Sequence, residues 1–277
     1  MGAAKDAALM SDPMALVEAL VPLSHKAGAV ILEVYGREDL GVQRKADDSP
    51  VTEADGKAEA VILAGLAELA PGVPVVAEES VAAGRIPDVA GVEAFFLVDP
   101  LDGTKSFIKR EGEFTVNIAL MVGGVPVAGV VHVPVQQATY WGAFAADVPD
   151  RSVALRQIGG AAAETIAVRP PPEAGLTVLA SRSHGAGPAL ERFLDRFAVA
   201  ERISASSSLK FCRVAEGVAD LYPRFGPTCE WDTAAGDAVL RAAGGRVTTE
   251  DGAPLTYGKG GKFLNPNFIA WGFPPSL

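Results

Sequence analysis

The sequence predicts an α+β fold in two halves: an N-terminal α+β half over residues 1–150 and a C-terminal α/β half over residues 151–277. In the first half, two long stretches with apolar residues at helical spacing precede a run of strand-like segments. After the candidate linker Pro170-Pro171-Pro172, strands and helices alternate, which is typical of an α/β unit. The 277 residues, 49% of them hydrophobic, suffice for one composite unit or two closely packed domains.

The N-terminal half opens with two expected helices. Apolar residues recur at helical spacing over residues 14–34, and this helix is expected to end near Gly36. A second helix is expected over residues 53–69, closed by Pro71-Gly72. Two short strands, a short helix and a three-stranded meander are then expected at residues 73–77, 95–98, 104–108, 116–122, 125–133 and 139–144.

The C-terminal half follows a stretch, residues 145–175, that shows no single pattern. Apolar runs then alternate with helical periodicity, and Gly244-Gly245 ends the last helix. Strands are expected at residues 176–180, 219–222 and 268–271, and helices at residues 188–197, 207–216 and 233–243.

Residues 114–146 contain no Asp, Glu, Lys or Arg and are long enough for a membrane-spanning helix. However, Gly123-Gly124, Pro126 and Pro134 interrupt this segment, which is also rich in valine. Buried strands joined by a Gly-Gly turn explain it better, so no transmembrane segment is expected.

The overall charge and the cysteines limit the partners and the compartment. A net charge of −10 argues against a general nucleic-acid-binding protein, whereas a small anionic substrate remains compatible with local Lys and Arg residues. Cys212 and Cys229 lack metal-type spacing, so free thiols in a reducing cytoplasm are expected. The first ten residues lack a signal-peptide pattern. Peripheral attachment to the cytoplasmic face of the inner membrane and a homodimer are left open.

Two carboxylates, Asp99 and Asp102, directly follow the apolar run of residues 95–98. An isolated buried carboxylate is very costly, so a positive group is expected beside this strand end. A hard divalent cation such as Mg²⁺ prefers oxygen ligands and keeps open positions for phosphate. This stretch therefore predicts metal-assisted phosphoryl chemistry.

Further acidic residues stand at the ends of expected elements rather than on solvated helix faces: Asp55, Glu78, Glu79 and Asp232. Taken singly, Asp55 or Asp232 is more readily a helix N-cap, and Glu78 could pair with an arginine. Together with Asp99 and Asp102 they favour one site. Asp55, Glu78, Asp99, Asp102 and Asp232 sum to −5, and a phosphate monoester adds about −2; two or three Mg²⁺ ions bring the total near neutrality.

Gly103 and Thr104 open the short expected helix that follows Asp102. Helix N-termini offer free N–H groups to phosphate oxygens, and a glycine lets the backbone approach closely. The basic residues Lys105, Lys109 and Arg110 follow directly and either complement the helix dipole or attract an anionic substrate.

These motifs resemble the inositol monophosphatase superfamily over about residues 15–271. The resemblance rests on residues 99–104 (DPLDGT), on Glu78-Glu79 upstream and on residues 231–236 (WDTAAG) downstream. Paired motifs in this order are far more specific than a lone glycine-rich loop. The resemblance implies the layered α-β-α-β-α fold of the inositol monophosphatase and fructose-1,6-bisphosphatase type of sugar phosphatase. It also implies a phosphatase that depends on Mg²⁺ and is inhibited by Li⁺.

Five further segments resemble the bacterial 3′(2′),5′-bisphosphate nucleotidase branch. They are residues 103–110 (GTKSFIKR), 112–120 (GEFTVNIAL), 181–184 (SRSH), 207–212 (SSLKFC) and 219–232 (ADLYPRFGPTCEWD). The implied reaction converts adenosine 3′,5′-bisphosphate and water to AMP and phosphate, by in-line attack of an activated water on the 3′-phosphorus. 3′-Phosphoadenylyl sulfate is the implied second substrate.

The resemblance also implies roles for individual residues. One metal site would use Glu78, Asp99 and the Leu101 carbonyl, and a second would use Asp99, Asp102 and Asp232. Asp55 and Thr104 would orient the water, while Gly103 and Thr104 contact the phosphate. Nucleotide contacts would come from Ser207, Lys210 and Arg224, with His184 as a further candidate. Ala77 departs from the glycine that inositol-specific members usually carry there.

Two alternatives stay open from the sequence. One is an inositol or other sugar-phosphate monophosphatase on the same scaffold. The other is a Mg²⁺-binding protein with a degenerate site, which the intact acidic set and Thr104 disfavour.

Overall fold

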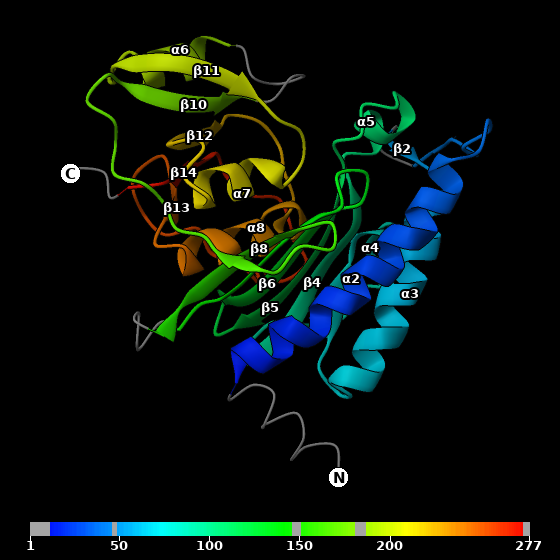
Figure 1. Ribbon diagram of the computed structural model, residues 1–277. Helices are drawn as coiled ribbons and strands as arrows, with labels where there is room; N and C mark the ends of the chain where they lie inside the picture. Colours follow the sequence, from blue (N-terminus) through cyan, green and yellow to red (C-terminus); the bar gives the residue numbers. More distant parts are fainter. Residues whose placement is uncertain (1–11, 46–48, 146–150, 181–186, 274–277) are drawn as a thin grey trace.

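The computed structural model describes residues 12–45, 49–145, 151–180 and 187–273. Two large sheets and three groups of helices alternate in layers, and a two-stranded pair, β1 (Gln43–Arg44) with β2 (Pro50–Val51), lies outside them (Figure 1). Helices α2 (Pro13–Tyr35) and α3 (Glu53–Leu69) cover one face of a seven-stranded sheet. Helices α7 (Leu209–Ala215) and α8 (Glu230–Ala242) lie between that sheet and a five-stranded one, and α6 (Pro188–Leu194) packs on the outer face of the latter. This order confirms the expected α-β-α-β-α layers.

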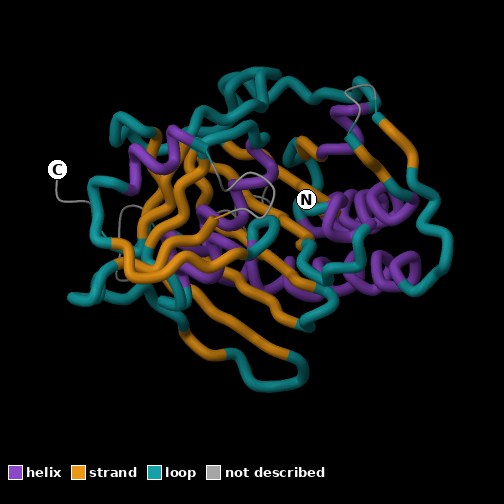
Figure 2. Tube along the Cα trace, turned by 90° about the horizontal axis from the view of Figure 1, so that it is seen from above, coloured by secondary structure: helices purple, strands orange, loops and turns teal. Residues whose placement is uncertain are grey.

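The helix pair α2 and α3 forms because each helix carries one apolar face. Leu20, Ala27 and Ile31 on α2, and Ile62 on α3, are fully buried in one cluster with the inner face of the sheet. Figure 2 shows the two long helices side by side, seen from above. Among the described residues, α2 is also long and apolar enough to pass a length and hydropathy test for a membrane span. Its packing against α3 and the sheet identifies it as a core helix.

The seven-stranded sheet has the order β3-β4-β5-β6-β7-β8-β9, with β3 parallel to β4 and the other neighbours antiparallel. The expected meander forms its centre, buried on both faces, which explains the absence of charge there. Gly129 lets α8 approach, because a Cβ there would lie 2.6 Å from the carbonyl oxygen of Ala235. The strand bounds are Val75–Ala77, Ala94–Asp102, Thr115–Val122, Val125–Val133, Ala138–Ala143, Val153–Ile158 and Glu164–Thr165.

The five-stranded sheet has the order β11-β10-β12-β14-β13 and a mixed strand direction. Its strands are β10 (Leu176–Ala180), β11 (Val199–Ser204), β12 (Leu221–Arg224), β13 (Arg246–Thr249) and β14 (Phe268–Trp271).

Six strands were not predicted from the sequence: β8, β9, β11, β13 and the two-residue strands β1 and β2. Strand β11 is an edge strand whose central residues are exposed, so no apolar run marks it. Strands β8 and β9 extend the N-terminal sheet past residue 150, through the stretch that shows no single pattern. Two short helices complete the described elements: α4 (Glu78–Ala82), which was not predicted, and α5 (Thr104–Ile108), which was.

Two histidines share one hydroxyl group between α2 and the sheet. His25 Nε2 lies 2.8 Å from Thr139 Oγ1, and His132 Nδ1 lies 3.0 Å from the same oxygen. His132 is 7% exposed, and its burial, aided by the neighbouring His25, lowers its pKa to about 4. The folded protein therefore holds His132 neutral.

We expect this histidine to weaken the fold in mild acid. Because its folded-state pKa is depressed, its contribution to stability is complete above about pH 6.5 and is lost as the pH falls toward 4. Between pH 7.5 and pH 5 the loss should be about 2 kcal/mol of unfolding free energy. Urea unfolding of the parent and of His132→Gln at both pH values checks this. The variant should lose less stability than the parent, and an unchanged difference between the two pH values contradicts the prediction.

Candidate active site

Strand β4 carries both central carboxylates of the site. It does not stop at Val98, as the sequence suggested, but continues to Asp102 with a bulge. Asp99 lies opposite Asn117 and Asp102 lies opposite Thr115. An advance of three residues along β4 therefore matches an advance of two along β5. Such a bulge redirects side chains, and here the Asp99 carboxylate turns back to accept the amide of Leu101 at 3.0 Å.

Four carboxyl groups converge at this end of the sheet. Burial, followed by the charges of Glu78, Asp102 and Asp232, raises the pKa of Asp99 well above its ordinary value. Burial likewise raises the pKa of Asp232, with Asp102 and Glu78 adding to the shift. Asp99 is buried and the other three carboxylates are half-buried, and their mutually repelling oxygens form a donor set that suits hard divalent cations.

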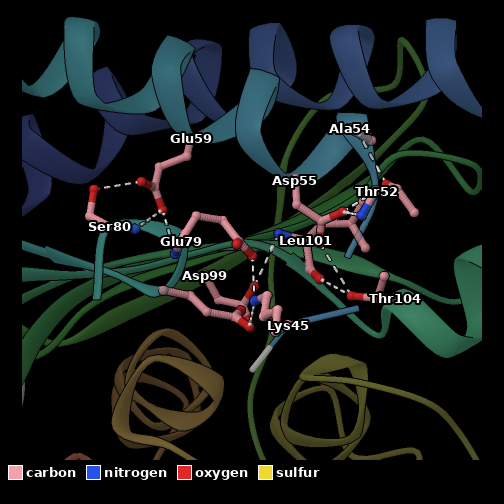
Figure 3. A network of polar contacts seen from close by, with 11 residues as sticks. Lys45, Thr52, Ala54, Asp55, Glu59, Glu79, Ser80, Asp99, Leu101 and Thr104 are labelled. Carbon is pink, nitrogen blue, oxygen red and sulfur yellow. Dashed lines mark hydrogen bonds and ion pairs between the residues drawn. The ribbon is translucent and has the colours of Figure 1, made fainter. Parts of the chain in front are cut away.

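The carboxylates lie near one another but do not form a closed set of ligands around one ion position. In the part of the chain that the structure describes, no three Asp, Glu, His or Cys side chains are already gathered as a cage for an ion. A cation of the protein itself lies at this cluster: Lys45 Nζ lies 2.6 Å from a carboxylate oxygen of Glu78 and 2.6 Å from one of Glu79. Figure 3 shows Lys45 beside Glu79 and Asp99. Burial alone would lower the pKa of this ammonium group, but the two glutamates outweigh burial and raise it.

A second cation, Lys210, faces the other side of the cluster. Its side chain is 4% exposed, and its Nζ donates to the Ser207 carbonyl at 2.7 Å. The ammonium also lies 5.1 Å from the centre of the Tyr222 ring. Burial lowers the pKa of Lys210 to about 8, although the charge of Asp102 opposes the shift.

The turn before α7 fixes Asp102 and Asp232 together. Ser207 Oγ donates to the Asp102 carbonyl at 2.8 Å, and the Ser208 amide donates to Asp102 Oδ2 at 2.8 Å. Ser208 Oγ donates to the Asp232 carbonyl at 2.6 Å. The sequence comparison predicted a nucleotide contact for Ser207. It predicted no role for Ser208, which stands in the same motif.

Gly103 joins β4 to α5 in a conformation that other residues avoid. Its φ is 94°, in the left-handed region. A Cβ at this position would also lie 2.1 Å from Ser207 Oγ, so both the backbone and the space require glycine. Thr104 begins α5 directly after it.

Asp55 connects α3 to Thr104 across the site (Figure 3). One of its oxygens accepts the Thr52 amide at 2.8 Å and the Thr52 hydroxyl at 2.7 Å, and the other lies 3.3 Å from Thr104 Oγ1. The Thr104 hydroxyl is equally 3.3 Å from the Leu101 carbonyl oxygen and can donate to one of the two. Burial raises the pKa of Asp55 to about 6, against the Thr52 hydrogen bonds.

The N-cap interpretation needs correction at both helix starts. Thr52, not Asp55, is the N-cap of α3, and Asp55 occupies the third helical position, where it completes a capping box. Asp232 has the same position in α8, which begins at Glu230, three residues before the expected start. Its carboxylate accepts the amide of Cys229 at 2.8 Å.

A cleft of about 770 Å³ opens over the cluster. Glu78, Asp102 and Asp232 line it, while Asp99, 1% exposed, lies beneath its surface. The same cleft is also lined by predicted substrate residues and by two residues of the basic segment: Gly103, Thr104, Ser207, Lys210, Arg224, Lys105 and Lys109.

Two arginines near the cleft differ in their roles. Arg224 donates from Nη2 to the Pro227 carbonyl at 2.9 Å, and its buried Nε has no hydrogen-bond partner among the described residues. Arg110 instead caps α2, donating to the carbonyls of Tyr35 and Arg37 and lying over the Tyr35 ring. The predicted basic patch therefore divides into two cleft lysines and one structural arginine. The candidate His184 lies outside the described residues.

The layered fold and this acidic cleft are those of a phosphatase of the sugar phosphatase type. The model of the inositol monophosphatase family matches residues 12–270, and the chain belongs to this family. It is 45% identical over 254 residues to the 3′(2′),5′-bisphosphate nucleotidase CysQ of Salmonella typhimurium. The aligned region covers 91% of this chain and 98% of that protein. The CysQ of Escherichia coli K12 is equally similar, with 45% identity and the same coverage.

Solved structures agree with this assignment. The crystal structure of CysQ from Bacteroides thetaiotaomicron superposes with a TM-score of 0.78 at 38% identity, covering 93% of this chain and 97% of that one. An IMPase of Thermotoga maritima superposes with a TM-score of 0.73 at 24% identity, covering 94% and 92%, which supports the fold alone.

Proposed function

We propose that this chain is a Mg²⁺-dependent 3′(2′),5′-bisphosphate nucleotidase of the cytoplasm. It removes the 3′-phosphate from adenosine 3′,5′-bisphosphate and from 3′-phosphoadenylyl sulfate. The observation that carries the proposal is that one cleft combines acidic ligands with the two cations Lys210 and Arg224. A nucleotide with two phosphates needs both features, whereas a monophosphate needs the acidic set alone. The naming of the CysQ relatives as bisphosphate nucleotidases supports the same substrate class.

The residues that would hold the cations are Glu78, Asp99 with the Leu101 carbonyl, Asp102 and Asp232. The donor chemistry fits, because carboxylate oxygens are hard ligands and because Asp99, which is buried, is repelled by the half-buried Glu78, Asp102 and Asp232 around it. When bound, two or three Mg²⁺ ions neutralise this charge, acidify a water and stabilise the leaving 3′-oxygen. Competition by Li⁺ at such a site would inhibit the enzyme.

The other residues position the reactants. Asp55, held by Thr52, accepts from the Thr104 hydroxyl, and this pair orients the attacking water in line with the 3′-phosphorus. The backbone at Gly103 and Thr104 contacts the phosphate undergoing attack. Lys210 and Arg224 balance the 5′-phosphate, with Ser207 fixing the loop between them and the metal ligands. A contact from His184 and a homodimer remain predictions.

A substrate panel tests the proposal. Phosphate release is measured from adenosine 3′,5′-bisphosphate, 3′-phosphoadenylyl sulfate and inositol 1-phosphate, with Mg²⁺, with added Li⁺ and after chelation. We expect preference for the two nucleotides, inhibition by Li⁺ and no turnover without Mg²⁺. Preference for inositol 1-phosphate would instead identify a sugar-phosphate monophosphatase, and no release from any substrate would identify a degenerate metal-binding protein.

We expect Arg224→Ala to discriminate between these substrates. A charge-assisted contact to phosphate is worth about 1.5–3 kcal/mol, so kcat/KM for adenosine 3′,5′-bisphosphate should fall by about 10- to 100-fold. Turnover of inositol 1-phosphate, which lacks a 5′-phosphate, should change little. Lys259→Ala serves as the control, because Lys259 pairs with Glu230 and does not line the cleft. Equal losses on both substrates would refute the assignment of Arg224 to the 5′-phosphate.

A further inference from the structure

Glu59 is a buried carboxylate on α3 that no step of the proposed reaction uses. It is 4% exposed and accepts three hydrogen bonds from the start of α4 (Figure 3). Oε2 accepts the Glu79 amide at 2.8 Å and the Ser80 amide at 3.3 Å. Oε1 accepts the Ser80 hydroxyl at 2.7 Å.

These contacts hold the backbone that carries Glu78. The Glu79 amide belongs to the peptide bond that directly follows Glu78, so its anchoring restricts the direction of the Glu78 side chain. The N-cap of α4 is Ala77, which has no side chain able to accept an N–H group. Glu59 therefore supplies from another helix the acceptor that the local sequence lacks.

The position of Glu59 on α3 links two parts of the site. It follows Asp55 by four residues, one helical turn, so both carboxylates lie on the same face of the helix. Asp55 accepts from Thr104, while Glu59 accepts from the backbone next to Glu78. One turn of α3 thus sets the spacing between the water-orienting pair and a metal ligand.

We propose that Glu59 is a positioning residue that orients Glu78 and Glu79 for divalent cation binding. The inference rests on the metal site of the proposed function and adds a residue to it. Side chains that fix metal ligands from behind typically change metal affinity or activity by about 10- to 100-fold when removed. A residue that merely stabilised the fold would leave the affinity for the metal unchanged once the protein was folded.

Binding of Mn²⁺ to the full chain, followed by isothermal titration calorimetry without substrate, measures the effect directly. Glu59→Ala should weaken Mn²⁺ binding by about 10- to 100-fold. Glu59→Gln should stay within about threefold of the parent, because its amide oxygen still accepts both backbone N–H groups. Circular dichroism confirms that each variant is folded before titration.

Asp220→Asn is the matched control. Asp220 is another fully buried carboxylate that accepts a backbone amide, from Thr177 at 2.7 Å, but it lies directly before β12 of the five-stranded sheet and does not line the cleft. We expect this variant to lose stability and to keep the Mn²⁺ affinity of the parent. Equal weakening by Asp220→Asn would mean that any loss of stability affects the metal site, which overturns the specific role of Glu59.

The outcomes separate this inference from the proposed function. If the parent fails to bind Mn²⁺, the metal site and the inference both fall. If the parent binds Mn²⁺ and folded Glu59→Ala binds it equally well, the inference alone is wrong. Should Glu59→Ala not fold, Ser80→Ala removes one of the three hydrogen bonds and should weaken binding several-fold, and unchanged binding there refutes the inference.

Discussion

Asp99→Asn should lower kcat for adenosine 3′,5′-bisphosphate by about 10³-fold while the protein remains folded. A bound divalent ion contributes several kcal/mol of charge stabilisation in the transition state, and each ~1.4 kcal/mol is a factor of ten in rate. Asn keeps the oxygen that accepts the Leu101 amide, so the bulge in β4 should survive. Phosphate release at saturating Mg²⁺ measures the loss, and a near-normal kcat would contradict the assignment of Asp99 as a ligand.

The same substitution should raise the free energy of unfolding in Mg²⁺-free buffer at neutral pH. The folded-state pKa of Asp99 is raised, because burial and three neighbouring carboxylates disfavour its charged form. Its ionised form therefore costs stability above the unfolded pKa, and that cost disappears as the pH falls toward about 4. Added Mg²⁺ should raise the melting temperature of the parent far more than that of the variant. Asp220→Asn should instead lower the free energy of unfolding, because Asp220 accepts hydrogen bonds from its neighbours. The opposite signs distinguish Asp99, which other carboxylates repel, from a carboxylate whose partners stabilise it.

The central carboxylates could be predicted from the sequence because each stands next to an unmistakable local signal. Asp99 and Asp102 follow an apolar run, and Asp232 precedes the small residues of a helix start. Such signals depend on neighbours within a few positions, which is the range over which periodicity and capping operate. The meander was predictable for the same reason, since its alternation of apolar runs and glycine turns is local.

Lys45 carries no such signal. It stands in a polar segment beside a two-residue strand, and its partners Glu78 and Glu79 are more than thirty positions away. The sequence predicted a positive group at the strand end, and metal ions were the expected source of that charge. The fold also places the ammonium group of Lys45 there. Strand β11 was missed for a related reason, because a hydrogen-bonded edge needs no apolar pattern.

The helical periodicity of residues 55–62 could have predicted that Glu59 is buried. Residues Asp55, Ala58, Glu59 and Ile62 are buried at positions i, i+3, i+4 and i+7 of α3, so a glutamate stands within an otherwise apolar or functional face. A charged residue in such a face must find buried partners. The identity of those partners, the first amides of α4, depends on how α3 packs over the sheet and could not be read from the sequence.

Thr104→Ala should lower kcat by about 10²- to 10³-fold, within the range that a positioned proton-transfer partner contributes. The hydroxyl is the group that joins Asp55 to the start of α5. Alanine keeps the helix intact but removes this hydrogen bond. The 3.3 Å separations to Asp55 and Leu101 are longer than an ideal O–H···O bond, as is common before reactants are bound. The loss should therefore appear in kcat rather than in stability or in Mn²⁺ affinity.

Thr104→Ser decides whether the hydroxyl or the methyl group matters. Serine keeps the donor but loses the β-branched restriction on χ1, so kcat should stay within about tenfold of the parent. The pH profile gives an independent readout, because the alanine variant breaks the contact with Asp55, whose pKa is raised to about 6 by burial. In the parent, kcat should rise with pH as Asp55 ionises to its accepting form, and this limb should be lost in Thr104→Ala and kept in Thr104→Ser. If serine is as inactive as alanine, or if all three proteins share one pH profile, the hydroxyl does not couple Asp55 to the reaction.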